Sequence, residues 1–564
     1  MNRSIKLASV VVSLTAMLGL AACGAGGTTV GGGAASSTGK SGGTVDFLAQ
    51  SDFSHLDPAR GWDGGVDNFY QVLYRTLVMW KAGTGKAQIV PDLAESLGTP
   101  SDDYKTWTFH LRKGMYFQTG QQITSQDLKF GIERAWDPQA GIGSPYSKTL
   151  IAAPAGYKGP YESGSLSTIG TPDSSTIVFH LKTSYPDFNY AATEPNFTAF
   201  PVGTGANDAF DKTPISSGPY EVAGYTPGSS LVLKRNPYWK QSSDPNRSAL
   251  PNTLQFTFGL SGATIDQRLL ADQGDDQNAI GLWSIEPATV ARIQTAQMKA
   301  RTISGAMGCT GYIALNTTKK PLNDLKVRQA IEWATDKQTM VDANGGSVLA
   351  SPAASIESPT VPGRTATDVY ATADGTGDVA KAKALLARAG YANGFTITLQ
   401  TSNDSVSEGM GVAWQAALAR VGIKVQLDEL AASSFYQTIG TISQESDAAQ
   451  TGWCPDWPSG LTFLPPLFES SEYLTSVGNG DLSQINDPAL NAQFATIASM
   501  ADTTAQNAAY AKLDVRIQQL ALVVPTVYAN TVELVGGNVA GSYSSPAWGS
   551  GVDFVSVGLK NPGS

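Results

Sequence analysis

The sequence predicts an α/β protein with at least two lobes. Helix-forming and strand-forming patterns alternate in its second half: helical segments at 378–389 and 409–420 each end at a glycine and are followed by alternating apolar strands at 395–399 and 423–427. This order is typical of βαβ units, so we expect a parallel or mixed sheet there. The folded part has about 520 residues, more than one hydrophobic core usually serves, so a cleft between lobes is expected.

The N-terminal third follows a different pattern. Trp107-Thr108-Phe109-His110-Leu111 alternates and then breaks at Lys113-Gly114, which is typical of antiparallel strands joined by short turns.

The first 22 residues are typical of a secretory signal. They contain two basic residues, no acid and an apolar stretch from Ala8 to Leu20, which is too short to span a bilayer as a helix. The stretch ends in Leu20-Ala21-Ala22-Cys23, which resembles the bacterial lipobox. That resemblance implies a lipid-modified Cys23 as the new N-terminus; the alternative is an ordinary signal cleaved near Ala22.

A tether follows the signal. Residues 24–43 contain nine glycines among twenty residues, a composition that cannot bury a core and behaves as a flexible linker. Its root-mean-square reach is roughly 25 Å. We expect folded structure to begin near Thr44.

Composition disfavours catalytic, metal-binding and nucleic-acid-binding functions. Loss of the signal leaves 36 basic and 48 acidic residues, a net charge of −12, without a basic patch for nucleic acid. The three histidines, His55, His110 and His180, do not have the spacing of a zinc site. Walker, Gly-x-Ser-x-Gly and Gly-x-Gly-x-x-Gly motifs are absent. We therefore expect a protein that is not an enzyme and has no cofactor.

Segment 309–330 carries the most specific pattern. It predicts a strand, a proline turn at Pro321 and a helix capped by Asn323 or Asp324 that runs to about Asp342. It also resembles the signature of family 5 extracellular solute-binding proteins, the peptide- and nickel-binding group of ABC importers. Further family motifs follow in the same order: Ser54-His55-Leu56-Asp57-Pro58, Leu111-Arg112-Lys113-Gly114, Ser217-Gly218-Pro219-Tyr220, Arg235-Asn236-Pro237-Tyr238-Trp239, Gly452-Trp453-Cys454-Pro455-Asp456-Trp457 and Val524-Pro525.

The resemblance implies a two-lobed clam of the periplasmic-binding-protein type, class II, with mixed sheets and an extra subdomain on the first lobe. The corresponding division is 1–22 for the signal, 23–43 for the acylated cysteine and tether, 44–88 with 205–308 and 523–564 for lobe I, 89–204 for the extra subdomain, and 309–522 for lobe II.

Cys309 and Cys454 are the only cysteines of the body, and an even pair in an exported protein suggests a disulfide. Among family members, the oligopeptide binders look most similar, because their equivalent strand also starts with a cysteine and their Gly-Trp-Cys-x-Asp string supplies its partner. The resemblance therefore implies a Cys309–Cys454 bridge; two buried thiols are the alternative.

The ligand site is also implied by the resemblance. In the similar peptide binders, the aspartate at the position of Asp456 pairs with the α-ammonium of the peptide; the alternative is an aspartate that caps a turn beside Pro455. Trp453 and Trp457 flank it and are expected either to wall side-chain pockets or to belong to the core.

Three tyrosines and one glutamine complete the expected site. Tyr312, Tyr146 and Tyr528 resemble tyrosines of the cleft, although tyrosine hydroxyls also satisfy hydrogen bonds in cores. Gln450 stands where the similar peptide binder has an arginine for a ligand carboxylate, and glutamine cannot neutralise that charge. The departure leaves room for a longer, modified or non-peptide ligand.

We therefore expect a monomeric, lipid-anchored receptor on the extracytoplasmic face of a bacterial membrane. It would capture oligopeptides by hinge closure and deliver them to the transmembrane subunits of an ABC permease. The alternatives are the same fold with another solute (a sugar, siderophore or signalling peptide), a sensory lipoprotein, and a secreted hydrolase, which three scattered histidines disfavour.

Overall fold

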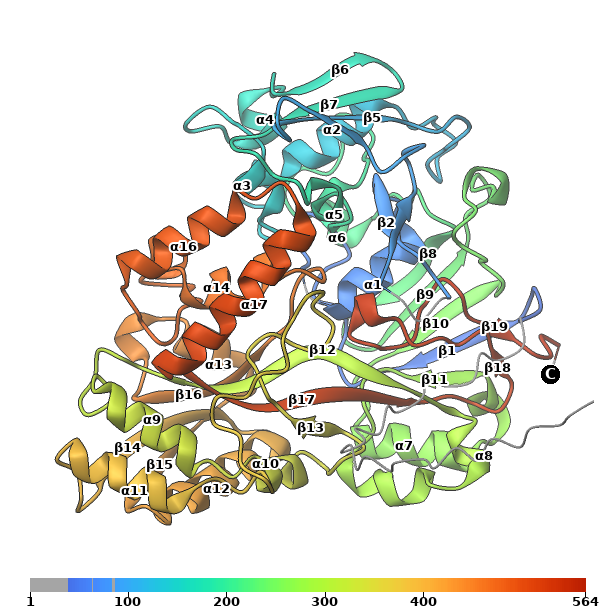
Figure 1. Cartoon of the computed structure of the whole chain (residues 1–564). Coiled ribbons are helices and arrows are strands. Elements are labelled where there is room, and N and C mark those ends of the chain that lie inside the picture. Colours follow the sequence, from blue (N-terminus) through green and yellow to red (C-terminus); the bar gives the residue numbers. More distant parts are fainter. Residues whose placement is uncertain (1–38, 63, 84–86, 564) are drawn as a thin grey trace, which may run out of the picture.

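The computed structural model describes residues 39–62, 64–83 and 87–563 (Figure 1). The predicted signal, Cys23 and most of the predicted tether lie outside the described residues. Three larger sheets organise the molecule. In Figure 1 the smallest of them lies at the top, the sheet that contains β1 on the right, and the sheet that contains β14 at the lower left.

The first sheet has five strands in the order β11-β1-β10-β9-β8. Strand β1 is parallel to β10 and β11, whereas β8, β9 and β10 are antiparallel neighbours. Phe47 and Phe256 stack across adjacent strands at 4.7 Å in the core beneath helix α1 (Gly64–Leu73). The strands are β1 (Thr44–Leu48), β8 (Tyr220–Thr226), β9 (Ser230–Arg235), β10 (Thr253–Thr257) and β11 (Ala279–Gly281).

The second sheet has six strands in the order β13-β17-β12-β16-β14-β15. The predicted βαβ unit is confirmed, because β14 and β15 are parallel and helix α12 (Ser405–Ala419) connects them. The strands are β12 (Thr302–Leu315), β13 (Ala350–Pro352), β14 (Phe395–Ser402), β15 (Ile423–Leu430), β16 (Ala448–Trp453) and β17 (Val523–Leu534).

Strands β12 and β17 connect the two sheets. They are 14 and 12 residues long and pair antiparallel. Immediately after β17, Val535 forms a bridge to Ile280 of the first sheet, and Leu534 packs against Leu48 in a shared apolar cluster. Figure 1 shows both strands crossing the middle of the molecule.

The third sheet is antiparallel, as the alternation around residue 109 predicted, with the order β4-β5-β7-β6. Helix α2 (Ser125–Glu133) covers it and begins with a capping box between Thr124 and Asp127. The strands are β4 (Thr99–Ser101), β5 (Thr106–His110), β6 (Ile169–Asp173) and β7 (Thr176–His180), and a separate pair joins β2 (Val78–Trp80) and β3 (Ile89–Pro91).

The helix predicted after Asp324 is shorter than expected. Asp324 caps α9 (Leu325–Ala334), but the backbone becomes extended at Thr335, and Asp336 caps a new helix, α10 (Lys337–Ala343). The second aspartate cap favours this break, because its side chain satisfies a free N–H group of the new helix. The prediction of one helix to Asp342 was therefore wrong.

The remaining elements are short segments and covering helices. They are α3 (Tyr146–Leu150), α4 (Gly159–Ser163), α5 (Phe188–Ala191), α6 (Ala209–Lys212), α7 (Gly262–Ala271), α8 (Ala296–Lys299), α11 (Val379–Arg388), α13 (Ala432–Ile439), α14 (Pro465–Phe468), α15 (Ser470–Tyr473), α16 (Pro488–Ala498), α17 (Thr503–Leu520), β18 (Val539–Ala540) and β19 (Gly558–Leu559).

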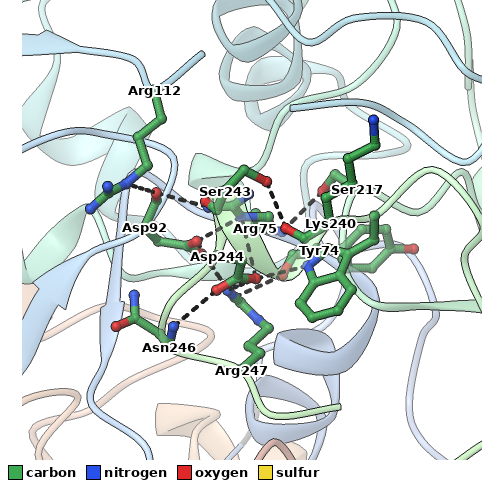
Figure 2. A network of polar contacts seen from close by, with 12 residues as sticks. Tyr74, Arg75, Asp92, Arg112, Ser217, Lys240, Ser243, Asp244, Asn246 and Arg247 are labelled. Atoms are coloured by element: carbon green, nitrogen blue, oxygen red, sulfur yellow. Dashed lines mark hydrogen bonds and ion pairs between the residues drawn. The ribbon is translucent and has the colours of Figure 1, made fainter. Parts of the chain in front are cut away.

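A buried network of charges fixes the segments that follow α1, β3 and β9 (Figure 2). Arg75 donates to Asp92 at 2.7 Å, and Arg247 donates to Asp92 at 2.8 Å and to Asp244 at 3.0 Å. All four side chains are at most 1% exposed. Since each guanidinium meets carboxylates directly, the network balances its own charges, as buried ions require.

Candidate ligand-binding site

A cavity of about 850 Å³ lies where the segments around the three sheets meet. Its walls come from segments 51–54 and 65–71 near α1, 193–195 after α5, 452–458 after β16, and 546–549 near the C-terminus. This volume is typical of sites for small ligands and short peptides. Segments far apart in sequence thus form one site.

Asp456 lines this cavity from the turn after β16. The hydroxyl of Tyr146, the first residue of α3, donates a hydrogen bond to its Oδ2. Burial raises the pKa of the Asp456 carboxyl to about 6, while the Tyr146 hydroxyl acts in the opposite direction. The bond joins the turn after β16 to the part of the chain that carries the third sheet.

Glu194 is a second carboxyl at the same place. It lines the cavity, is 5% exposed, and its Oε2 has no hydrogen-bond partner among the described residues. Burial, and next the charge of Asp456, raise its pKa well above the ordinary value. Two adjacent buried carboxyls retain a proton more strongly than one alone. The sequence around Glu194 contains no motif that could have revealed it.

The two predicted tryptophans line the cavity in different ways. Trp457 is 1% exposed and packs in the core of the third-sheet region, with its ring 4.7 Å from that of Tyr146. Its Nε1 donates to Asp187 at 3.4 Å. Trp453 is half-buried, and its Nε1 donates to the Thr462 carbonyl at 2.9 Å. The packing of Trp457 therefore holds the turn that carries Asp456 against the third-sheet region.

The predicted disulfide between Cys309 and Cys454 is confirmed. Both cysteines line the cavity, next to the paired residues Thr310 of β12 and Trp453 of β16. The bridge attaches the turn that carries Asp456 to the central strand β12.

Tyr312, Gln450 and Tyr528 do not belong to the cavity lining, and neither does Tyr146, which contacts the lining residue Asp456. Tyr312 is 3% exposed and packs in an apolar core. Gln450 donates to the Ser407 carbonyl at 3.1 Å, which directs it toward the α12 side of the sheet. The Tyr528 hydroxyl accepts a hydrogen bond from the Ser355 N–H at 2.7 Å. The ligand contacts expected from sequence stay predictions for these three residues, as for Tyr146, Trp453, Asp456 and Trp457.

Exposed aromatic side chains accompany the cavity. Trp62, Trp283 and Tyr436 line it and are 40%, 51% and 71% exposed. Trp283 adopts a φ of +80°, which is rare for a residue with a bulky side chain. Its N–H donates to Glu533 at 3.3 Å, which helps to hold this conformation. Exposed aromatic surface at a cavity is typical of a binding site.

A family model described as bacterial extracellular solute-binding proteins, family 5 Middle, matches residues 88–474, more than half of the chain. The chain belongs to this family. The two-lobed fold with mixed sheets that its motifs predicted is therefore confirmed. Its curated relatives are binding proteins, not enzymes.

The relatives of this family 5 protein are named after different ligands. The chain is 26% identical over 426 residues to a probable D,D-dipeptide-binding periplasmic protein of Escherichia coli K12, covering 74% of this chain and 76% of the relative. It is 25% identical over 504 residues to heme-binding protein A of Haemophilus influenzae, covering 84% and 85%. The solved clavulanic acid biosynthesis oligopeptide binding protein 2 is 29% identical, with a TM-score of 0.87 and coverage of 94% and 99%.

Two features are absent from the part of the chain that the structure describes. Among the residues that the structure describes, no helix has both the length and the apolarity needed to cross a bilayer. The same part of the chain holds no group of three or more His, Cys, Asp or Glu side chains placed to bind a metal ion.

Proposed function

We propose that this protein is the lipid-anchored binding subunit of an ABC importer and captures oligopeptides in the cavity. The observation that supports this function is the half-buried carboxylate of Asp456, which lines the cavity and has no cationic partner within 4.0 Å among the described residues. A carboxylate of this kind is stabilised by a ligand that brings the missing positive charge.

The α-ammonium of a peptide fits this position chemically. It has three N–H donors, and the carboxylates of Asp456 and Glu194 offer charge-assisted acceptors from two different segments. When the ammonium enters, both carboxyls can ionise, because the ligand charge offsets their mutual repulsion. The peptide main chain would then extend along the aromatic walls.

Binding would favour closure of the lobes. The Tyr146–Asp456 hydrogen bond and the insertion of Trp457 already hold the turn after β16 against the third-sheet region. A ligand that contacts Asp456 and Glu194 together would bind the closed arrangement more tightly than an open one. The equilibrium between open and closed lobes would therefore shift toward the closed state. The predicted lobe boundaries and the delivery to a permease are part of this proposal.

Identification of the natural ligand tests the proposal directly. The purified full-length protein is denatured, and the released small molecules are identified by mass spectrometry. We expect peptides with free N-terminal amines. Release of a sugar, siderophore or haem would contradict the peptide assignment and support another solute on the same fold.

Lipid anchoring depends on Cys23. We expect the wild-type protein in the membrane fraction of the producing bacterium and Cys23→Ala in the soluble extracytoplasmic fraction, because the anchor's acyl chains supply the membrane affinity. Immunoblots of both fractions measure the distribution, with Ser36→Ala in the tether as a control. Equal membrane association of the Cys23→Ala variant would contradict the anchor.

Peptide affinity should fall at least tenfold between pH 7 and pH 5. The Asp456 pKa of about 6 lies above the unfolded value, so protonation through this range removes the charge that binds the ammonium. The groups that face it are Glu194 and the hydroxyls of Tyr146, Tyr185 and Tyr473, none of them cationic.

Calorimetric titrations with one peptide at several pH values measure this slope. The peptide amine stays protonated throughout the range. An N-acetylated peptide is the control and should show no comparable slope. An affinity for the free-amine peptide that is constant from pH 5 to 7 would exclude Asp456 as its partner.

A further inference from the structure

The cavity lining has more acidic residues than one ammonium group would engage. Five lining residues are acidic: Asp52, Asp67, Glu194, Asp456 and Glu533. Among the described residues that line it, Arg247 is the one basic residue, and its guanidinium is already paired with Asp92 and Asp244 in the network of Figure 2. The cavity therefore offers carboxylates but no uncommitted cation for an anionic ligand group.

Glu533 is the acidic residue best placed for a second cation. It is 4% exposed, and its carboxylate accepts hydrogen bonds from the Val552 N–H at 2.7 Å and the Trp283 N–H at 3.3 Å. Among the described residues, no Lys, Arg or His nitrogen lies within 4.0 Å of it. Because a carboxylate has about four acceptor positions, two bonds leave capacity for a ligand.

The backbone around Glu533 supports this interpretation. A Cβ added at Gly551 would lie 3.1 Å from Glu533 Oε1, so the glycine allows the chain to approach the carboxylate closely. Trp283, whose backbone N–H contacts the carboxylate, also lines the cavity, and its side chain is half-exposed. An indole beside a carboxylate is a favourable environment for ammonium and guanidinium groups.

Glu533 lies on a different part of the wall from Asp456. It pairs with Ile303 on β12, whereas the disulfide attaches the Asp456 turn to Cys309 of the same strand. Six residues of strand span at most about 20 Å. An extended peptide rises about 3.3 Å per residue, so a residue a few positions after the bound N-terminus would reach Glu533.

We propose that the cavity selects peptides that carry a second positive charge, a lysine or arginine side chain bound by Glu533, in addition to the N-terminal ammonium. The inference rests on the proposed peptide-binding function and names its preferred substrates. It follows from the buried carboxylate of Glu533 without a cationic partner, the Trp283 side chain in the same lining and the absence of a free counter-cation there.

Calorimetry with pentaalanine peptides that carry one lysine, or one norleucine of similar shape, at positions 2 to 5 tests the inference. At pH 7.5 and low salt we expect the wild-type protein to bind the lysine peptide at least tenfold more tightly at one or more positions. Glu533→Gln should remove this preference and keep the requirement for a free N-terminal amine. The matched control Glu162→Gln, at an exposed ion pair, should keep both.

The outcomes separate the two proposals. If the wild-type protein binds lysine and norleucine peptides equally at every position, the Glu533 subsite is wrong while peptide binding stands. If no peptide binds, both are wrong. Should Glu533→Gln fail to fold, the comparison of lysine and norleucine peptides on the wild-type protein still tests the subsite. Added salt should weaken the lysine preference, since salt screens charge pairing, and this provides the second measurement.

Discussion

Replacing Asp456 with asparagine should weaken the binding of a free-amine peptide by about 2 to 5 kcal/mol, the usual cost of truncating a buried charge pair. This corresponds to roughly thirty-fold to several-thousand-fold in Kd. Asparagine keeps the shape of the side chain and can still accept the hydrogen bond of Tyr146, so the change removes charge rather than volume. Calorimetry with one peptide and its N-acetylated form measures the effect.

The controls isolate the charge at this position. Asp342→Asn, at an exposed position of helix α10, should leave the affinity unchanged. Tyr146→Phe removes the hydroxyl that donates to Asp456 and should weaken binding by a smaller amount, because the carboxylate then loses one stabilising hydrogen bond. If Asp456→Asn and the wild-type protein bind the free-amine peptide equally, the ammonium role is wrong.

Asp456→Asn should not destabilise the ligand-free protein. The pKa of Asp456, about 6 in the folded state, exceeds the ordinary value near 4. The ionised carboxylate therefore reduces stability above pH 6, and this penalty disappears as pH falls below about 4. Asparagine removes the penalty at neutral pH. Loss of binding in Asp456→Asn would then reflect the site and not the fold.

The residues that sequence located best are those held by local motifs. Trp453 is the last residue of β16, and Cys454, Asp456 and Trp457 follow it in one turn, so placing that turn at the cavity places all four in its lining. The disulfide was predictable because the body of the chain has two cysteines and no other partner for either.

Residues whose position depends on tertiary packing were not predictable. Glu194 and Glu533 lie in separate segments without a motif, and only folding brings them to the same cavity as Asp456. For Tyr312 and Tyr528, alternation along a strand predicts two faces but does not say which face meets the cleft. Tyr312 packs in an apolar core. The Tyr528 hydroxyl instead accepts hydrogen bonds from the N–H groups of Ala354 and Ser355.

The parallel unit of the second sheet was predictable for a related reason. Strands β14 and β15 and their helix are consecutive in sequence, and their glycine stops mark the ends locally. The antiparallel pairing of β12 with β17 joins residues more than two hundred positions apart. No local sequence pattern encodes such a pairing. The β12–β17 pair nevertheless connects the two sheets and positions Glu533 in the cavity wall.

Removing the disulfide should lower the free energy of unfolding by about 4 kcal/mol, within the usual range of 2 to 5. The bridge closes a loop of 145 residues, and chain-entropy models assign the larger values to long loops. The double variant Cys309→Ala/Cys454→Ala leaves no unpaired thiol in the body of the chain. Denaturant unfolding of the ligand-free protein, followed by tryptophan fluorescence, measures the change.

Reductant provides the matched control for this disulfide prediction. It should lower the unfolding midpoint of the wild-type protein and leave the double variant unchanged, since the variant has no bridge to reduce. Peptide affinity should also fall in the double variant, because the turn that carries Asp456 is no longer attached to β12 and must be ordered when the ligand binds. Equal unfolding midpoints for the two proteins would contradict the stability prediction and mean that the strand pairing beside Thr310 and Trp453 already restrains this loop.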